Sequence, residues 1–300
     1  MEQASFDQAL KEYLEQTGML SLLSDEHAGR LEAALAAIRG LHAAFPQPSL
    51  GNASPEQCRQ WLDRLLQIFD DFTFDGNVVA PTPAHFAVVT TWWAYANRQA
   101  KAIRSLADNG MGGDAVPLAR SMIEFALWSV ALSQDTGPLL STVLRNSDEE
   151  EFYTLKLATG GPLEMPPEVI DLVKSTPKVE GPGSPAKDFS KICRLLGVGD
   201  TILITWRILS TLSHPGAAMA YLSTQLAPDK IRVQKSLALP GIEQSGLAQE
   251  MLTITIPCLI WSGFAVDRLI ADHPLRGDLQ AIAEEAQVTD LTIEPDAANG

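Results

Sequence analysis

An arginine and a histidine in the second half of the chain have the residue types and the spacing for acid–base chemistry on an anion. Six residues separate Arg207 from His214, and Pro215 follows directly. At 3.6 residues per turn, a helix through this segment places positions 207, 210, 211 and 214 on one face. The resulting polar stripe consists of Arg207, Ser210, Thr211 and His214. Because a residue before proline avoids helical geometry, the helix ends at His214 and frees its imidazole.

The stripe suits a phosphate-bearing ligand. Its two ends lie about 10 Å apart along a helix axis, a distance that a long guanidinium and an imidazole can bridge. Arginine can hold a phosphate through two N–H groups, and a histidine with an ordinary pKa of about 6.5 can accept or donate a proton at neutral pH. Three interpretations are open: a capped helix end whose histidine bonds a neighbouring carbonyl, a pocket for an anionic ligand, and a nuclease site. A second arginine–histidine pair occurs at Arg268 and His273.

A second constellation is the pair Arg120 and Glu124, which carries the charges of the apolar segment 115–134. The two residues stand four positions apart on a helix that is apolar on all sides. Such a helix is buried, and buried charges persist when they are paired. The pair therefore either ties two helices together or serves the stripe, with Glu124 orienting His214 or Arg207, or with Arg120 joining the anion site.

The Arg-x6-His spacing resembles the Arg-x(4 to 6)-His motif of the HEPN domain superfamily, a group of all-helical proteins that includes metal-independent toxin ribonucleases. The blocks LARSMIEFAL at 118–127 and LSTLSHP at 209–215 look like those of a bacterial helical family of unknown function related to HEPN folds. The resemblance covers residues 84–271. The chain departs from the ribonuclease pattern at Ile208, where those enzymes carry a polar residue.

The resemblance implies a HEPN-like helical bundle that cleaves RNA without a metal or cofactor. Arg207 would stabilise the phosphate charge, His214 would act as general base on the 2′-hydroxyl, and a cyclic phosphate would form. Because HEPN active sites are commonly composite across a two-fold axis, the resemblance also implies a homodimer. The alternative is a non-enzymatic sensor, antitoxin-like or scaffold protein whose stripe binds a small anionic ligand or a protein partner.

The elements that must position these residues are helices, since apolar residues recur with helical periodicity along most of the chain. Ser54, Pro55 and Gln57 form a capping signature for one helix, and the glycine-rich segment 109–114 predicts a turn between two others. We expect a small β-hairpin within 227–239. The expected helices cover approximately residues 55–72, 84–107, 116–132, 186–196, 200–214, 242–271 and 279–286.

The predicted fold class is an all-α helical bundle in three parts. Residues 1–80 form an N-terminal helical extension, and residues 81–275 form the bundle, interrupted by a proline- and glycine-rich excursion at 159–186. Residues 276–300 form an acidic C-terminal helix and tail, which we expect to fray because acids outnumber bases there.

Composition narrows the class of partner. The 300 residues are 46% hydrophobic and 20% charged, which excludes disordered and fibrous proteins. The formal net charge of -15 disfavours binding to DNA, to an anionic membrane or to nucleic acid without specificity. A local cationic site for RNA remains compatible with this average, because a net charge says nothing about one surface.

Motif searches favour a cytoplasmic protein without a cofactor. The sequence contains no nucleotide-binding glycine loop, zinc-protease, serine-hydrolase or EF-hand signature, and its five histidines form no ligand set, so we predict no metal site. Cys58, Cys193 and Cys258 have no CxxC spacing, which fits a reducing compartment. The N-terminus lacks a secretory signal, and the apolar segment 251–266 is too short for a membrane span. The composition suits a bacterial source.

Overall fold

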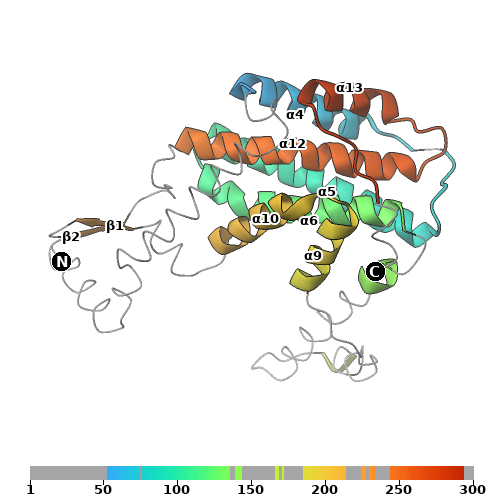
Figure 1. Cartoon of the computed structure of the whole chain (residues 1–300), viewed down its shortest axis with the longest axis horizontal. Coiled ribbons are helices and arrows are strands. Elements are labelled where there is room, and N and C mark those ends of the chain that lie inside the picture. Colours follow the sequence, from blue (N-terminus) through green and yellow to red (C-terminus); the bar gives the residue numbers. More distant parts are fainter. Residues whose placement is uncertain are drawn as a thin grey trace.

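The chain folds as an all-α bundle with one small antiparallel hairpin (Figure 1). This computed structural model describes residues 53–74, 76–135, 139–143, 166–168, 171, 185–213, 224–227, 230–233 and 244–293. Its elements are α4 (Pro55–Asp71), α5 (Pro83–Asp108), the 3-10 helix η1 (Gly112–Ala115), α6 (Val116–Ser133), α9 (Pro185–Leu195), α10 (Gly199–Ser213), β1 (Thr224–Ala227), β2 (Lys230–Val233), α12 (Gln244–Arg268) and α13 (Arg276–Ala286).

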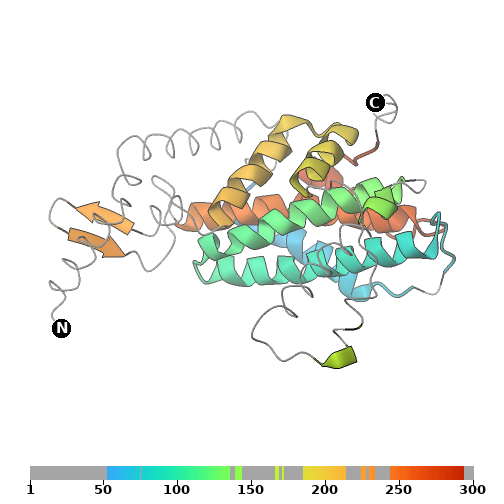
Figure 2. The ribbon, with the colours of Figure 1, turned by 90° about the horizontal axis from the view of Figure 1, so that it is seen from below.

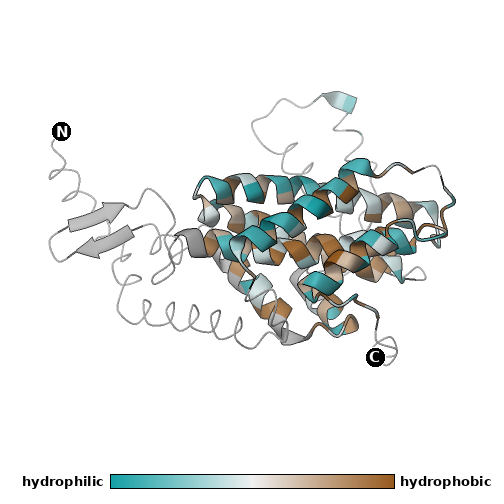
Figure 3. Cartoon of the chain, turned by 90° about the horizontal axis from the view of Figure 1, so that it is seen from above, coloured by the Kyte–Doolittle hydropathy of each residue, from teal (hydrophilic) through white to brown (hydrophobic). Residues whose placement is uncertain are grey.

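The apolar helix α12 lies at the centre of the bundle. It packs against α5 and α6 on one side and against α4 and α13 on the other (Figure 1). The view from below shows α10 and α9 crossing α6 on the face that α12 leaves free (Figure 2). Hydrophilic residues are prominent on the opposite side of the molecule, where α4 and α13 face solvent (Figure 3). The α4–α13 layer is therefore a solvated cover, and the α6–α10 side holds the predicted polar stripe.

Local signals in the sequence set where the helices begin. Ser54 caps α4 through the predicted capping box: its Oγ accepts the N–H of Gln57 at 3.1 Å, and the Gln57 side chain accepts the N–H of Ser54 at 3.3 Å. Thr82 caps α5, with Pro83 at the first helical position. Ser54 and Thr82 each place a side-chain oxygen near N–H groups that the first turn of a helix leaves unpaired.

The glycine-rich segment 109–114 is a helix-to-helix connection, as the sequence predicts. Asn109 ends α5, Gly110 takes a positive φ of 71°, and η1 leads into α6. Gly112 is buried against α12, where a Cβ atom on it would lie 2.5 Å from the backbone nitrogen of Ala248. The start of α12 can approach this turn so closely because residue 112 has no side chain.

The hairpin is present but lies earlier in the chain than expected. Its strands pair Thr224 with Val233 and Ala227 with Lys230, so it begins three residues before the predicted range 227–239 and ends six residues before the end of that range. The sequence prediction relied on the alternation around Ile231, which belongs to the second strand. The first strand, with its short sequence TQLA, gives no comparable signal.

The acidic C-terminal region is ordered through Ile293, which corrects the expectation that it frays. α13 begins at Arg276, three residues before the expected start, and it packs on α12 and α4. Val288 is buried and donates its N–H to the carbonyl of Ala283 at 2.8 Å, which fastens the chain after the helix. The predicted N-terminal extension through residue 52, most of the excursion at 159–186 and the last residues of the tail lie outside the described residues.

Among the residues that the structure describes, two helical segments are long and apolar enough to cross a membrane. They are Gly112–Ser133 and Leu247–Arg268, and 61% and 72% of their most apolar windows are buried inside the bundle. Core helices of soluble proteins have the same composition, and helices this buried by protein have little surface left for lipid. The apolar segment 251–266 thus lies within a core helix, as its sequence suggests.

The close approach at Gly112 predicts a large effect of adding one methyl group. Gly112→Ala should lower the free energy of unfolding by about 2 kcal/mol, because backbone atoms of α12 must move to admit the Cβ. The matched control is Gly277→Ala in α13, where a Cβ meets nothing within 4 Å and should stabilise by about 0.5 kcal/mol. Urea unfolding of both variants measures the difference. Equal unfolding midpoints for the two variants would contradict the close contact between Gly112 and α12.

Candidate functional site

The pair Arg120 and Glu124 forms one side of a polar network between α6 and α10. Nη2 of Arg120 lies 3.0 Å from Oε1 of Glu124, as expected for residues one helical turn apart. Their side chains are 24% and 29% exposed, so the pair is half-buried and not fully enclosed as the apolar sequence around it suggests. Partial desolvation strengthens the attraction while some contact with water limits its cost.

Residues of α10 complete the network. Ser210 accepts the Nε–H of Arg120 at 2.7 Å and donates its own hydroxyl proton to the carbonyl of Trp206 at 2.8 Å. The indole N–H of Trp206 reaches back to Oε1 of Glu124 at 2.9 Å. The guanidinium of Arg120 also lies over the Trp206 ring, 4.9 Å from its centroid, which is a cation–π geometry.

Trp206 is the member of this network that the sequence interpretation missed. The indole is buried, with its ring 4.7 Å from that of Phe189 in α9. Its N–H nevertheless donates to a carboxylate. The available signal was the spacing of Trp206 and Ser210, one turn apart on a helix, together with the rule that a buried indole N–H finds an acceptor.

The structure therefore brings three of the predicted residues together: Arg120, Glu124 and Ser210. Arg120 bonds both Glu124 and Ser210, and these contacts hold α10 on α6. Arg207 is exposed on α10. Thr211 lies in α10, but its side chain is outside the described residues, as is His214 as a whole. The predicted stripe is thus split between an inward-facing part at Ser210 and an outward-facing part at Arg207.

Exposed cations gather on the α9–α10 pair. Lys191 and Arg194 of α9 and Arg207 of α10 are all exposed. In a chain with a net charge of -15, three exposed cations on two consecutive helices make a local contrast with the average. Cationic side chains of this kind attract phosphate groups through charge-assisted hydrogen bonds.

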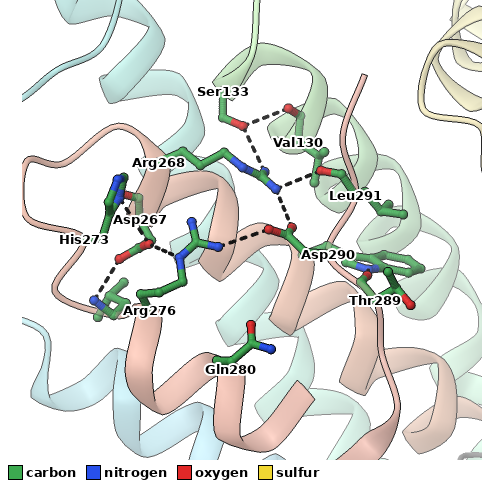
Figure 4. Close-up of polar contacts among 12 residues, drawn as sticks. Val130, Ser133, Asp267, Arg268, His273, Arg276, Gln280, Thr289, Asp290 and Leu291 are labelled. Carbon is green, nitrogen blue, oxygen red and sulfur yellow. Dashed lines mark hydrogen bonds and ion pairs between the residues drawn. The ribbon is translucent and has the colours of Figure 1, made fainter. Parts of the chain in front are cut away.

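The second arginine–histidine pair forms no such site. Arg268 turns to Asp290 and to the carbonyl of Leu291, whereas His273 bonds the backbone carbonyl of Asp267 through Nδ1 at 2.9 Å (Figure 4). The two side chains belong to one polar network but do not converge on a common point. Within the part of the chain that the structure describes, no group of three or more histidine, cysteine or acidic residues could hold a metal ion.

A buried histidine and aspartate form a further polar pair that the sequence gave no reason to select. His85 and Asp135 lie 3.6 Å apart between Nε2 and Oδ2 and are both buried. Nδ1 of His85 bonds Thr82 at 2.9 Å, and Asp135 accepts the N–H of Leu139 at 2.9 Å. Each residue therefore has a local structural task at a helix start.

The fold and these contacts define the class: an all-α bundle whose cation-bearing α10 is held on α6 by a polar network. Residues 86–230 match the model of a family of unknown function, DUF5677, and this range includes most of α5 and all of α6, α9 and α10. This match confirms the expected similarity to a family of unknown function, while the relation to HEPN folds and the bacterial source stay predictions. A search of curated proteins and a search of solved structures each gave no match.

The network between α6 and α10 predicts coupling between Glu124 and Trp206. Removing the acceptor in Glu124→Ala or the donor in Trp206→Phe should each cost about 1–2 kcal/mol of unfolding free energy. The double variant should cost less than the sum by about 1 kcal/mol, because both changes remove the same hydrogen bond. Urea unfolding of the four chains measures this coupling. As a control, the exposed pair Lys101 and Asp70 should show coupling below about 0.5 kcal/mol.

Burial of α9 predicts a pH dependence of stability. Burial raises the pKa of the Cys193 thiol to about 11 from an ordinary value of 9.0. The unfolded chain thus loses this proton at lower pH than the folded chain, so the stabilisation is complete below pH 9 and is lost as pH rises toward 11. The stability difference between wild type and Cys193→Ala should shrink by about 2 kcal/mol over this range in urea unfolding. A constant difference would contradict a buried thiol.

Proposed function

We propose that the chain is a metal-independent endoribonuclease whose site lies on the solvent side of α10. The observation that carries the proposal is the division of α10 into two faces. Trp206 and Ser210 hold one face on α6, and this leaves Arg207 exposed on a helix whose orientation is fixed. An arginine on a fixed helix can hold a phosphate in one geometry, which catalysis requires.

His214 supplies the proton chemistry in this proposal. α10 remains helical to Ser213, one residue before His214, so helical geometry carries the face of Arg207 almost to the histidine. His214 would accept the proton of a ribose 2′-hydroxyl, and the 2′ oxygen would then attack the phosphorus. The bond to the 5′ oxygen breaks and this oxygen takes a proton from water, which leaves a 2′,3′-cyclic phosphate and a 5′-hydroxyl end. Arg207 would stabilise the added negative charge on the phosphate during this step.

The exposed cations Lys191 and Arg194 support RNA as the substrate class, because they add positive charge on α9, a helix that packs against α10. Arg120, Glu124 and Ser210 act as positioning residues, since their bonds to each other and to Trp206 fix the helix that carries Arg207. A homodimer would complete the site if it is composite, as the resemblance to HEPN proteins implies. The cysteine spacing, which fits a reducing compartment, also favours action in the cytoplasm.

A second candidate is a non-enzymatic sensor, antitoxin-like or scaffold protein that binds a small anion or a protein partner on the same face. The observation that favours it is that Arg120 bonds both Glu124 and Ser210, which gives these predicted site residues a structural task, while Arg207 is exposed. One exposed arginine beside other cations is sufficient for binding an anion. Catalysis needs the histidine in addition.

Cleavage of RNA in EDTA distinguishes the two candidates. The full chain should convert total RNA or tRNA into fragments that end in cyclic phosphate, because no step needs a metal ion. His214→Ala should lower the rate by about 100-fold or more through loss of the base. Arg207→Ala should also lower it about 100-fold through loss of charge stabilisation.

Arg98→Ala is the matched control, since Arg98 is an exposed arginine of α5 whose guanidinium lies over Tyr95. It should leave the rate unchanged. Absence of cleavage by a folded wild-type chain of known oligomeric state would contradict the nuclease. Retained binding of phosphate that Arg207→Ala abolishes would then support the sensor or scaffold instead.

A further inference from the structure

The residues that follow α13 cross the end of the bundle in an extended form and are held there by side chains. We call Thr289–Ile293 the strap. It has no regular secondary structure and runs from α13 past the end of α12 to the end of α6 (Figures 1 and 4). The side chains that hold it come from α12, from α13 and from the end of α6, and they form what we call the strap site: Gln134, Trp261, Arg268 and Arg276.

The strap site recognises the backbone of the strap. The amide of Gln134 donates to the carbonyl of Leu291 at 3.2 Å and accepts the N–H of Ile293 at 3.0 Å. Trp261 donates its indole N–H to the carbonyl of Thr289 at 2.9 Å. The three bonded positions are alternate residues, so the strap site binds one edge of an extended segment, as a neighbouring strand would.

The strap site also recognises one side chain. The carboxylate of Asp290 lies between two arginines, with one oxygen bonded to Arg268 and the other 3.1 Å from Nη1 of Arg276. Arg268 is 14% exposed and donates to the carbonyl of Leu291 as well. Charge-assisted hydrogen bonds in such a partly dry place give strong preference for a carboxylate.

Contacts outside the strap keep this site in shape. The Nε–H of Arg276 bonds the fully buried carboxylate of Asp267 at 2.9 Å, and its guanidinium lies 4.8 Å from the centroid of the Phe264 ring. Asp267 in turn accepts the N–H of Leu275 at 2.9 Å. Gln134 also donates to the carbonyl of Val130. The arginine and the amide are therefore oriented by the bundle itself, independently of the strap.

We propose that the strap site is a peptide-binding site that the chain's own strap occupies and from which a competing peptide can displace it. Its ligand class is an extended segment with an aspartate followed by aliphatic residues one and three positions later, like Asp290, Leu291 and Ile293. The strap is held by backbone hydrogen bonds and ion pairs, and its Leu291 and Ile293 are half-buried. Contacts of this kind exchange with an equivalent ligand more readily than a closely packed core does.

The test loosens the strap in the full chain and supplies the same segment from outside. The probe is a labelled peptide with the sequence of residues 288–293 and blocked ends, titrated by fluorescence polarisation. Asp290→Ala weakens the strap but leaves every residue of the strap site intact. Asp278→Ala, an exposed acid of α13 outside this network, is the charge-matched control. Ile293→Pro is a second way to loosen the strap, because it removes the N–H that Gln134 accepts.

The Asp290→Ala chain should bind the peptide with a dissociation constant at least about tenfold lower than wild type or Asp278→Ala, because the intact strap competes at a high effective concentration. A peptide with asparagine in place of aspartate should bind about tenfold more weakly. Adding Gln134→Ala to Asp290→Ala should weaken binding again. Equal binding by all chains, or equal binding of both peptides, would overturn the proposal. If Asp290→Ala fails to fold, the same outcomes apply to Ile293→Pro.

Discussion

α12 is apolar around its whole circumference, and such a helix is stable in water when other helices cover each of its sides. α5, α6, α4 and α13 provide that cover, and η1 meets its start where Gly112 lacks a side chain. The order of the remaining elements follows from this requirement. One face of α6 packs on α12, and a second face, which carries Arg120 and Glu124, remains for another helix to cover. α10 can bind there because α12 has already fixed α6.

Polar contacts in this bundle set orientation at its boundaries, whereas apolar packing supplies the interior. The Arg120–Glu124 network fixes α10 at one boundary, and the Asp267–Arg276 network fixes α13 at another. In each network a carboxylate on one helix accepts a hydrogen bond from a side chain on a neighbouring helix. These bonds fix the relative orientation of the two helices, which nonpolar contacts alone would leave variable. Carboxylates outnumber cationic side chains in this sequence, 37 against 22, which favours networks in which an arginine is paired. The strap site and the face of α10 are both consequences of helices held in this way.

Sequence reasoning reached the helices with good accuracy because their signals are local. Ser54 and Pro55 mark a helix start through capping and proline geometry, and apolar periodicity gives the buried faces of the helices. The contact between Arg120 and Ser210 joins residues ninety positions apart. Their side-chain types predicted that each belongs to a polar site, but no sequence signal of short range predicts that these two residues are in contact. The acidic C-terminal region was misjudged for the same reason, since counting acids does not show that Asp290 lies between Arg268 and Arg276.

The two arginine–histidine pairs show why spacing predicts geometry within a helix and fails beyond its end. α12 ends at Arg268, and His273 follows a turn in which it and Asp272 take positive φ angles of 49° and 63°. The periodicity that would align the two side chains stops at the arginine, so they take different partners. α10, by contrast, continues from Arg207 to Ser213, and helical geometry applies over all but the last position. The spacing of a motif therefore predicts where two side chains lie only as far as one helix contains both residues. On that basis Arg207 and His214 form the stronger candidate pair.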